Sequence, residues 1–176
     1  MRPARSLLLA TVAASGLIGA RPIAGGEQFP RGLLSAEPRA NFCTIETRPL
    51  SFGVYDPLDG AAVEAVGQII YTCGAGNGPQ PQSPKNIRIA IARGYSSSFS
   101  DRAMAGPSYE TLHYNIYLDA THRTIWGDGT NGTEFYFDAK PPNKTPVTVP
   151  AYGRIDPRQD VPGGPYVDQP QVTILW

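Results

Sequence analysis

The chain has 176 residues, a length that suits one domain of ordinary size with terminal extensions. Its 15 Lys and Arg residues balance its 15 Asp and Glu residues, so the sequence offers neither the basic surface of a nucleic-acid-binding protein nor a strong acidic field. Glycine and proline together form about a fifth of the chain, and that many turn formers among short apolar runs predict many short β-strands.

Residues 1–20 have the three parts of a secretory signal peptide. Arg2 and Arg5 give a positive start, a short apolar stretch follows, and small residues end the segment at Ala20. A first buried helix is the alternative, but poor helix formers and the following Arg21-Pro22 pair disfavour it. We therefore expect a secreted protein, cleaved after Ala20 or Ala24. Beyond the signal, no apolar run is long enough to predict a transmembrane segment.

Two cysteines, Cys43 and Cys73, are the only thiols of the chain. In an oxidising compartment a lone pair predicts a disulfide bond. A metal site is the rival interpretation, but neither cysteine has a Cys or His at ligand spacing. The bridge would close a loop of about 30 residues and add roughly 3–4 kcal/mol of stability.

The remaining chain divides into a leader, residues 21–42, and a strand-rich domain, residues 43–176. The leader is interrupted by prolines and glycines and keeps no strict alternation. Alternating apolar residues bounded by turn signals predict the strands of the domain. These are residues 43–47, 50–57, 67–73, 87–91, 112–118, 124–126, 135–137, 147–149, 151–155, 164–168 and 172–176.

The clearest of these strands is 112–118, which together with 124–126 predicts a hairpin in the core. Leu112, Tyr114 and Ile116 alternate with polar neighbours, so they are expected on one buried face. Phe52 and Trp126 are also expected in the core. With no convincing amphipathic helix after residue 42, the pattern predicts an all-β fold, an antiparallel β-sandwich.

Several separated motifs resemble the spore coat protein U domain, and they appear in the order of that family. They are Cys43, Leu50-x-Phe52-Gly53-x-Tyr55-Asp56-Pro57, Gly67-x-Ile69-x-Tyr71-x-Cys73, Arg102-x-Met104, Leu112-x-Tyr114-Asn115-x-Tyr117-x-Asp119-Ala120, Trp126-Gly127-Asp128-Gly129, Gly164-x-Tyr166-x-Asp168 and Val172-Thr173-Ile174. The resemblance runs from Cys43 to Trp176. It implies an immunoglobulin-like sandwich that is incomplete because it lacks its last strand.

The resemblance also implies a function. The family is best known for subunits of archaic chaperone–usher pili, which assemble on the surface of Gram-negative bacteria and mediate attachment and biofilm formation. The implied partners are a periplasmic chaperone, an outer-membrane usher and neighbouring subunits, whose strands fill the groove left by the missing strand. Val172, Ile174 and Trp176 are then expected to form the edge of that strand-exchange groove.

The leader departs from the subunit pattern. A donor segment should be an alternating apolar strand, and residues 21–42 contain several prolines that lack an amide donor. Two interpretations remain open: a subunit that accepts a strand without donating one, which suits the end of a fibre, or a divergent protein outside any pilus.

An enzyme or a metal protein is a weaker interpretation of the same sequence. His113 and Asp119 share a strand face but lie roughly 20 Å apart at about 3.3 Å per residue, too far to share a metal ion. His122 and Asp128 are expected to be solvated hairpin residues, and the loop after Asp128 lacks the full calcium-ligand set. We expect no catalytic residues and no cofactor. A free-standing secreted binding domain is the main alternative, and a secreted hydrolase the least favoured.

Two aromatic residues stand apart from the core pattern. Tyr95 and Phe99 lie in a glycine- and serine-rich stretch with polar neighbours. Exposed aromatic side chains are common in binding surfaces. These two residues are therefore the candidates for an adhesive loop.

Overall fold

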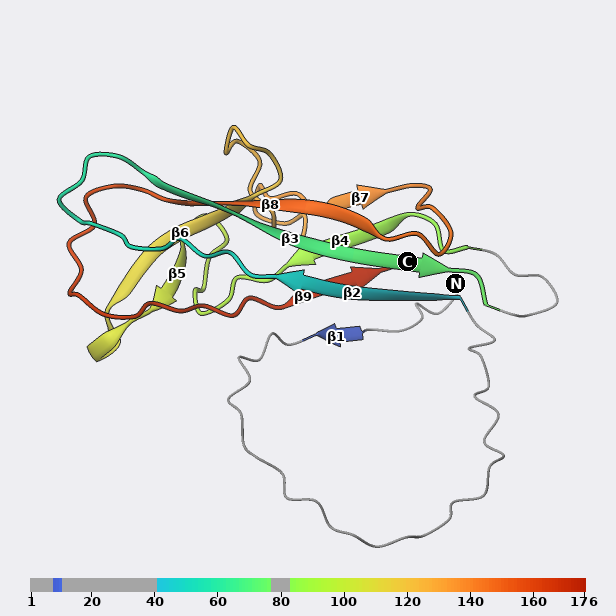
Figure 1. Ribbon diagram of the computed structural model, residues 1–176, viewed down its shortest axis with the longest axis horizontal. Coiled ribbons are helices and arrows are strands. Elements are labelled where there is room, and N and C mark those ends of the chain that lie inside the picture. Colours follow the sequence, from blue (N-terminus) through green and yellow to red (C-terminus); the bar gives the residue numbers. More distant parts are fainter. Residues whose placement is uncertain (1–7, 11–40, 77–82) are drawn as a thin grey trace, which may run out of the picture.

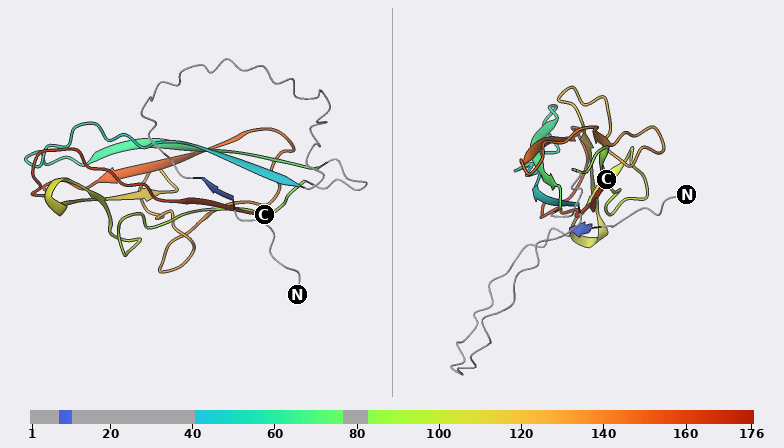
Figure 2. Two further views of the ribbon diagram at one scale, coloured as in Figure 1. Left: turned by 90° about the horizontal axis from the view of Figure 1, so that it is seen from below. Right: turned by 90° about the vertical axis from the view of Figure 1, so that its right-hand side faces the viewer.

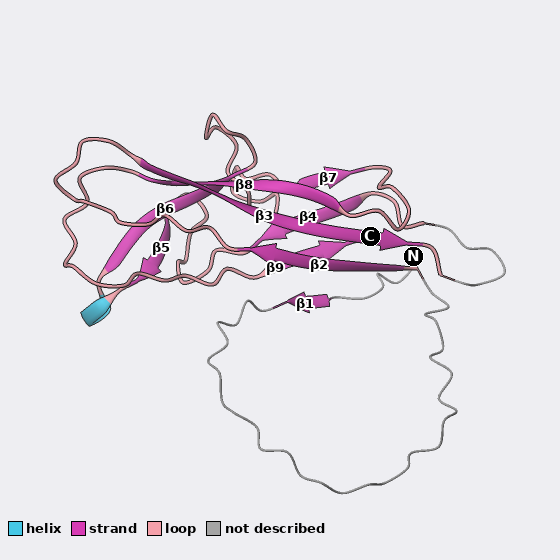
Figure 3. Ribbon diagram, viewed as in Figure 1, coloured by secondary structure: helices cyan, strands magenta, loops and turns pink. Residues whose placement is uncertain are grey.

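The computed structural model describes residues 8–10, 41–76 and 83–176 and shows two antiparallel sheets packed face to face. One sheet has the order β2-β3-β8-β6-β5 and the other β1-β9-β4-β7. The only helix among the described residues is a single short turn, η1 (Figures 1 and 3). The prediction of an all-β sandwich is confirmed.

The strand bounds follow the chain from end to end. They are β1 (Leu8–Ala10), β2 (Phe42–Arg48), β3 (Val63–Gly74), β4 (Ile87–Ile91), β5 (Arg102–Ala105), β6 (Thr111–Tyr117), β7 (Tyr136–Asp138), β8 (Val147–Ile155) and β9 (Val172–Leu175), with η1 (Pro107–Tyr109) between β5 and β6. The long strands run along the length of the molecule, and the end-on view shows the two layers enclosing one core (Figure 2).

The core lies between the sheets and is filled by alternate residues of each strand. In β3 the buried positions include Ile69, Tyr71 and Cys73, with less buried residues between them, as a strand with one inward face requires. Trp126 is fully buried, and its indole N–H donates to the carbonyl of Ile89 at 2.8 Å. The predicted burial of Trp126 is confirmed.

Three predicted strands differ in the structure. Residues 51–62 form a loop rather than a strand, and Gly53 adopts a positive φ of 73° there. Residues 124–126 join β6 only through an isolated bridge, and 164–168 contribute a single bridge from Val167 to Ala105. In contrast, β8 runs without a break through Pro150, where the sequence predicts two strands. β6 has ended at Tyr117, opposite Tyr152, so at Pro150 it no longer pairs with β8.

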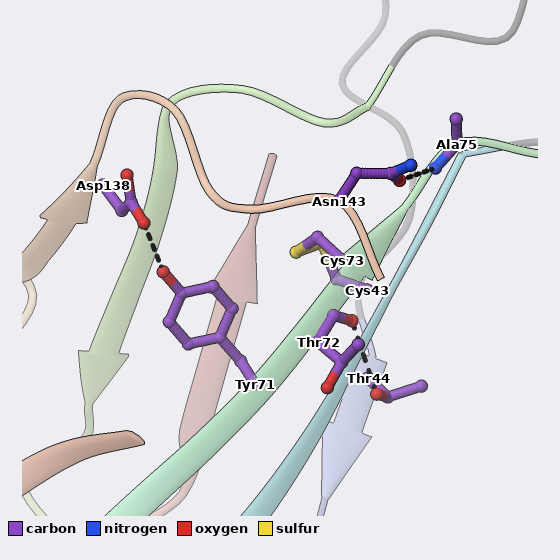
Figure 4. Close-up of a disulfide and its surroundings, with 8 residues drawn as sticks. All are labelled: Cys43, Thr44, Tyr71, Thr72, Cys73, Ala75, Asp138 and Asn143. Atoms are coloured by element: carbon purple, nitrogen blue, oxygen red, sulfur yellow. Dashed lines mark hydrogen bonds between the residues drawn. A yellow bond between two sulfur atoms is a disulfide. The ribbon is translucent and has the colours of Figure 1, made fainter. Parts of the chain in front are cut away.

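The disulfide is confirmed. Cys43 of β2 lies directly opposite Cys73 of β3 in the antiparallel register, and the sulfur atoms are bonded (Figure 4). It fastens the first residues of β2, which is an edge strand with a single neighbour. Beside it in Figure 4, the hydroxyl of Tyr71 donates to Asp138 at 2.6 Å and connects β3 to β7 of the other sheet.

Most of the predicted signal peptide (1–20) and of the leader (21–42) lies outside the described residues. Leu8–Ala10 forms β1, which pairs antiparallel with β9, with Leu8 opposite Ile174 and Ala10 opposite Val172. Asn41 and Phe42 are described, and Phe42 begins β2.

Candidate functional site: an apolar groove between two sheet edges

A groove opens where the edge of one sheet faces the edge of the other. β2 forms the edge of its sheet, and β9 has the core strand β4 on one side and only the short β1 on the other. The end of β2 and the segment leading into β9 line a cavity of about 550 Å³. Its apolar lining includes Leu50, Phe52, Ile69, Met104, Ile116 and Val172.

The backbone of β9 offers hydrogen-bonding groups to this edge. The N–H of Ala92 donates to the carbonyl of Gln171 at 2.8 Å, so the backbone groups of Gln171 face β4. Because backbone direction alternates along a strand, those of Val172 and Ile174 face the opposite edge, where β1 pairs. β9 can therefore hold an added antiparallel strand through main-chain bonds.

Val172 and Ile174 are both buried, and their side chains belong to the core between the sheets. Trp176 follows the end of β9 and packs, partly buried, against that core. Thr173 and Leu175 lie on the opposite face of the strand, where Leu175 is exposed. The three residues predicted for the groove edge are thus close together, and their role in strand exchange stays a prediction.

One carboxylate lies in the wall of the cavity. Asp168 Oδ2 accepts from the Tyr114 hydroxyl at 2.7 Å, and Oδ1 accepts from the backbone N–H groups of Tyr95 and Gln169 at 2.9 and 2.7 Å. Burial, together with the nearby charge of Asp168, raises the pKa of Tyr114, so its hydroxyl stays protonated and donates. Gly94 has a φ of 70° and no side chain, which lets the Asp168 carboxylate approach.

Arg102 connects the two sheets behind the cavity. Its guanidinium has no exposed surface and donates to the carbonyls of Ile91, Ala92 and Trp126 and to Asn115 Oδ1. It also lies 5.4 Å from the centre of the Phe99 ring. Arg102 and Asn115 stand in two of the motifs named above, but the network itself could not be predicted, because the other acceptors of Arg102 are backbone carbonyls from distant segments.

The two residues predicted for an adhesive loop, Tyr95 and Phe99, differ in their exposure. Tyr95 is exposed, but Phe99 is only 5% exposed because its ring packs against Arg93 and Arg102. The prediction that Phe99 forms part of an exposed adhesive loop is therefore wrong. Polar neighbours in sequence do not prevent an aromatic ring from packing under a loop.

Three other apolar side chains are far more exposed, and the sequence did not single them out. Val54, Leu58 and Tyr109 are 92%, 91% and 95% exposed. Val54 and Leu58 belong to the 51–62 loop and Tyr109 to η1, and these two segments lie toward the end of the sandwich away from the C-terminus (Figure 1). Each segment contacts the connection between β8 and β9: Tyr55 bonds to the backbone of Asp156 and Gln159, and Pro107 lies against Gly164. The sequence signal that could have predicted their exposure was an apolar residue inside a turn-rich stretch without alternation.

Tyr109 has an unusual backbone at the β5–β6 tip. Ser108 and Tyr109 both adopt left-handed conformations, with φ of 54° and 67°. Such conformations are unfavourable for a bulky residue and persist where the surroundings impose them. At this tip the Tyr109 side chain lies in solvent. We call the set of Val54, Leu58 and Tyr109 the loop-end cluster.

The polar residues considered for a metal or catalytic site do not come together in the structure. His113 contacts Asp101 at 2.6 Å, while His122 lies 3.5 Å from Glu64. Asp119 and Asp128 each cap their own turn, to Thr121 and Thr130 respectively. Among the residues that the structure describes, no group of three His, Cys, Asp or Glu side chains could hold a metal ion. In the same part of the chain, no helix is long and apolar enough to cross a membrane.

Comparison with known proteins gives a family and a fold. The model of the Spore Coat Protein U domain matches residues 34–173. No curated protein matches. A similar solved structure is the CsuC–CsuE chaperone–tip adhesion subunit pre-assembly complex from the archaic chaperone–usher Csu pili of Acinetobacter baumannii, with 19% identity and a TM-score of 0.51. The match covers 77% of this chain but only 40% of that chain, and at this identity it shows the fold alone.

Proposed function

We propose that this chain, which belongs to the Spore Coat Protein U domain family, is a surface subunit of a chaperone–usher pilus that is completed by a strand from another polypeptide. The observation that carries the proposal is the edge of β9. It faces an apolar cavity, and its outward backbone groups accept an antiparallel strand. An exposed edge of this kind aggregates unless another chain covers it.

The assembly follows from the same edge. A periplasmic chaperone strand covers β9 first, and the N-terminal segment of a neighbouring subunit replaces it at the outer-membrane usher. Main-chain bonds supply the affinity in this mode, and alternate side chains supply the register. The similarity to a chaperone–subunit complex supports these partners. The role is structural, without catalysis.

The position in the fibre follows from the leader. Residues 21–42 contain several prolines, which cannot donate to a ladder, so the chain accepts a strand without donating one and belongs at the end of a fibre. A peptide of residues 21–42 should then fail to complete the groove of another subunit. Tight binding of that peptide as a strand would instead make this an ordinary repeating subunit.

Attachment is assigned to the loop-end cluster, which would point away from the fibre. Exposed apolar residues on a buttressed tip suit contact with a hydrophobic surface. Replacing Leu58 and Tyr109 by serine should reduce adhesion to a hydrophobic surface while leaving assembly and melting temperature unchanged. The matched control is Val66→Ser, because Val66 is also exposed but lies in the strand β3 and not in a loop. Equal loss of adhesion in the control would contradict this assignment.

The central experiment uses two neighbouring residues of β9. Ile174→Asp places a carboxylate in the apolar core side of the groove, so co-expressed chaperone should no longer be captured. Leu175→Asp changes the exposed face of the same strand and should leave capture intact. Because Ile174→Asp can also impair folding, a donor peptide should be titrated onto the unmodified protein. It should raise the melting temperature by mass action.

A monomeric exported chain that is highly stable alone, and unaffected by donor strands, would favour the free-standing binding domain. Export itself is tested by intact mass. The secreted chain should lack about 20–24 N-terminal residues and contain no alkylatable thiol. An uncleaved N-terminus with two reactive cysteines would contradict the secreted location.

A further inference from the structure

The main-chain ladder offered by β9 weakens at one residue. Pro170 lies two residues before Val172, so its backbone faces the same open edge. Proline has no amide hydrogen, and Pro170 can offer this edge only a carbonyl. A strand added antiparallel to β9 therefore finds no N–H donor at Pro170 for its own backbone carbonyl, once it has passed Val172. Beyond this point side chains must contribute more of the binding.

The cavity begins where the ladder weakens. Its walls come from Thr47–Leu50 on one side and from residues 166–172 on the other. Core-facing positions alternate along a strand. The position of an added strand that pairs with Val172 faces the core, and so does the position two residues further on. That second side chain enters the cavity.

The cavity wall that this side chain meets includes the carboxylate of Asp168, and this carboxylate has unused hydrogen-bonding capacity. Oδ1 accepts from two backbone N–H groups, whereas Oδ2 accepts only from the Tyr114 hydroxyl. An ionised carboxylate has about four acceptor sites. One site on Oδ2 therefore remains. Arg102 does not supply the missing donor, because its N–H groups bond to carbonyls and to Asn115.

We infer that the cavity selects the strand it accepts by one side chain, two residues beyond the contact with Val172, which has an apolar body and ends in a hydrogen-bond donor for Asp168. Lys and Tyr fit this description. The apolar body contacts residues such as Ile69 and Met104, and the terminal N–H or O–H meets the carboxylate. The inference rests on the proposed strand acceptance and adds to it the chemistry of the partner.

The cavity also has a positive charge, Arg48, on the side opposite Asp168, and the two charges together determine which side chain is preferred. Arg48 also lines the cavity, but it is exposed and bonds to Gln68 at 3.3 Å. Its charge is screened by water more than that of the partly buried Asp168. The cavity should therefore prefer a donor or cation over a carboxylate at the selected position.

The test uses synthetic peptides and the chain purified after export. Each peptide contains the sequence Leu-Leu-Ala that pairs with β9 in the structure, and only the residue two positions after the alanine varies. The variants are Tyr against Phe, Lys against Met, and Glu. Tyr should bind about tenfold more tightly than Phe, and Lys more tightly than Met, as expected for a hydrogen bond to a charged group.

Two protein variants separate recognition from a structural role. In Asp168→Asn the Tyr/Phe and Lys/Met affinity ratios should fall close to one, whatever happens to overall affinity. In Tyr114→Phe the competing hydroxyl is removed from Oδ2, and the ratios should persist or grow. A purely structural Asp168 would change all peptides equally. If Asp168→Asn does not fold, the wild-type ratios and Tyr114→Phe decide the matter.

Equal binding of Tyr and Phe peptides, unchanged ratios in Asp168→Asn, or tightest binding of the Glu peptide would each overturn the inference. Binding of the apolar peptides without selectivity would leave strand acceptance standing. Failure of every peptide to bind would overturn strand acceptance itself, so the two failures are distinguishable.

Discussion

Arg102 shows how one side chain can connect two sheets without an ionic partner. Its guanidinium is enclosed by backbone carbonyls and the Asn115 amide, and burial lowers its pKa from the ordinary value. Charged residues are rarely fully buried. The arrangement is tolerated because four hydrogen bonds replace the lost water.

Replacing Arg102 by methionine should strongly destabilise the fold. The change leaves several buried acceptors unpaired, each worth about 1–3 kcal/mol, so unfolding should become easier by about 3 kcal/mol or more. Arg154→Met is the matched control, since Arg154 pairs with Glu64 and Asp156 at the surface and should matter by about 1 kcal/mol or less. Chemical denaturation measures both. Similar losses in the two variants would contradict the role given to Arg102.

Asp119 gives the fold a specific dependence on acid. The Thr121 hydroxyl and backbone N–H groups, including that of Thr124, donate to its carboxylate and hold its pKa below the usual range. A lowered folded-state pKa adds stability above the unfolded value of about 4, and that stability is lost as pH falls through the folded pKa. Asp119→Asn should therefore flatten the decline in stability below about pH 4. Urea unfolding at several pH values checks this, and an unchanged slope would exclude it.

At the scale of strands, sequence periodicity predicted the regular part of the fold. β3, β4 and β9 alternate in sequence and alternate in burial, whereas in β6 the polar Asn115 is buried together with Tyr114 and Ile116. The short β5 was missed because its run Arg-Ala-Met-Ala is almost wholly buried and shows no alternation. Residues 50–57 were assigned to a strand although their apolar side chains are divided: Phe52 packs against the core and Val54 lies in solvent.

The groove could be expected only in part. The family motifs implied an open edge at the C-terminal strand. In the structure β9 lies between β4 and the short β1, which belongs to the predicted signal peptide. The cavity could not be predicted, because it is formed by residues far apart in sequence, such as Leu50, Met104 and Asp168. The same holds for the loop-end cluster, since its two loops come together with the 156–164 segment only in the folded molecule.

The disulfide should matter most to β2. This strand has β3 as its only sheet neighbour, and Cys43–Cys73 joins the two strands across 30 positions of sequence. Replacing both cysteines by alanine should lower the unfolding free energy by roughly 3–4 kcal/mol. Hydrogen exchange should rise first in β2, whereas β8, with neighbours on both sides, should stay protected longer. Uniform exchange across both strands would contradict this order.

At the scale of the whole molecule, two different surfaces lie at different places along one long axis. The loops that carry the loop-end cluster lie toward the end away from the C-terminus, and β9, with β1 on its outer edge, lies along the side (Figure 1). Neither contains a metal cluster within the described residues. With a formal net charge of zero, the chain has little general repulsion between copies, so contacts between copies depend on which surfaces are left uncovered.

The direction of β9 determines how an added strand would resist force. β9 runs along the long axis, and an antiparallel partner lies parallel to that axis, with its hydrogen bonds perpendicular to it. Tension along the axis would load these bonds together in shear, whereas tension across it would break them one after another. Force spectroscopy should therefore record a higher rupture force when the bound strand is pulled along the axis than when it is peeled sideways. A surface subunit joined in this way would resist flow most strongly in the direction in which a tethered cell pulls it.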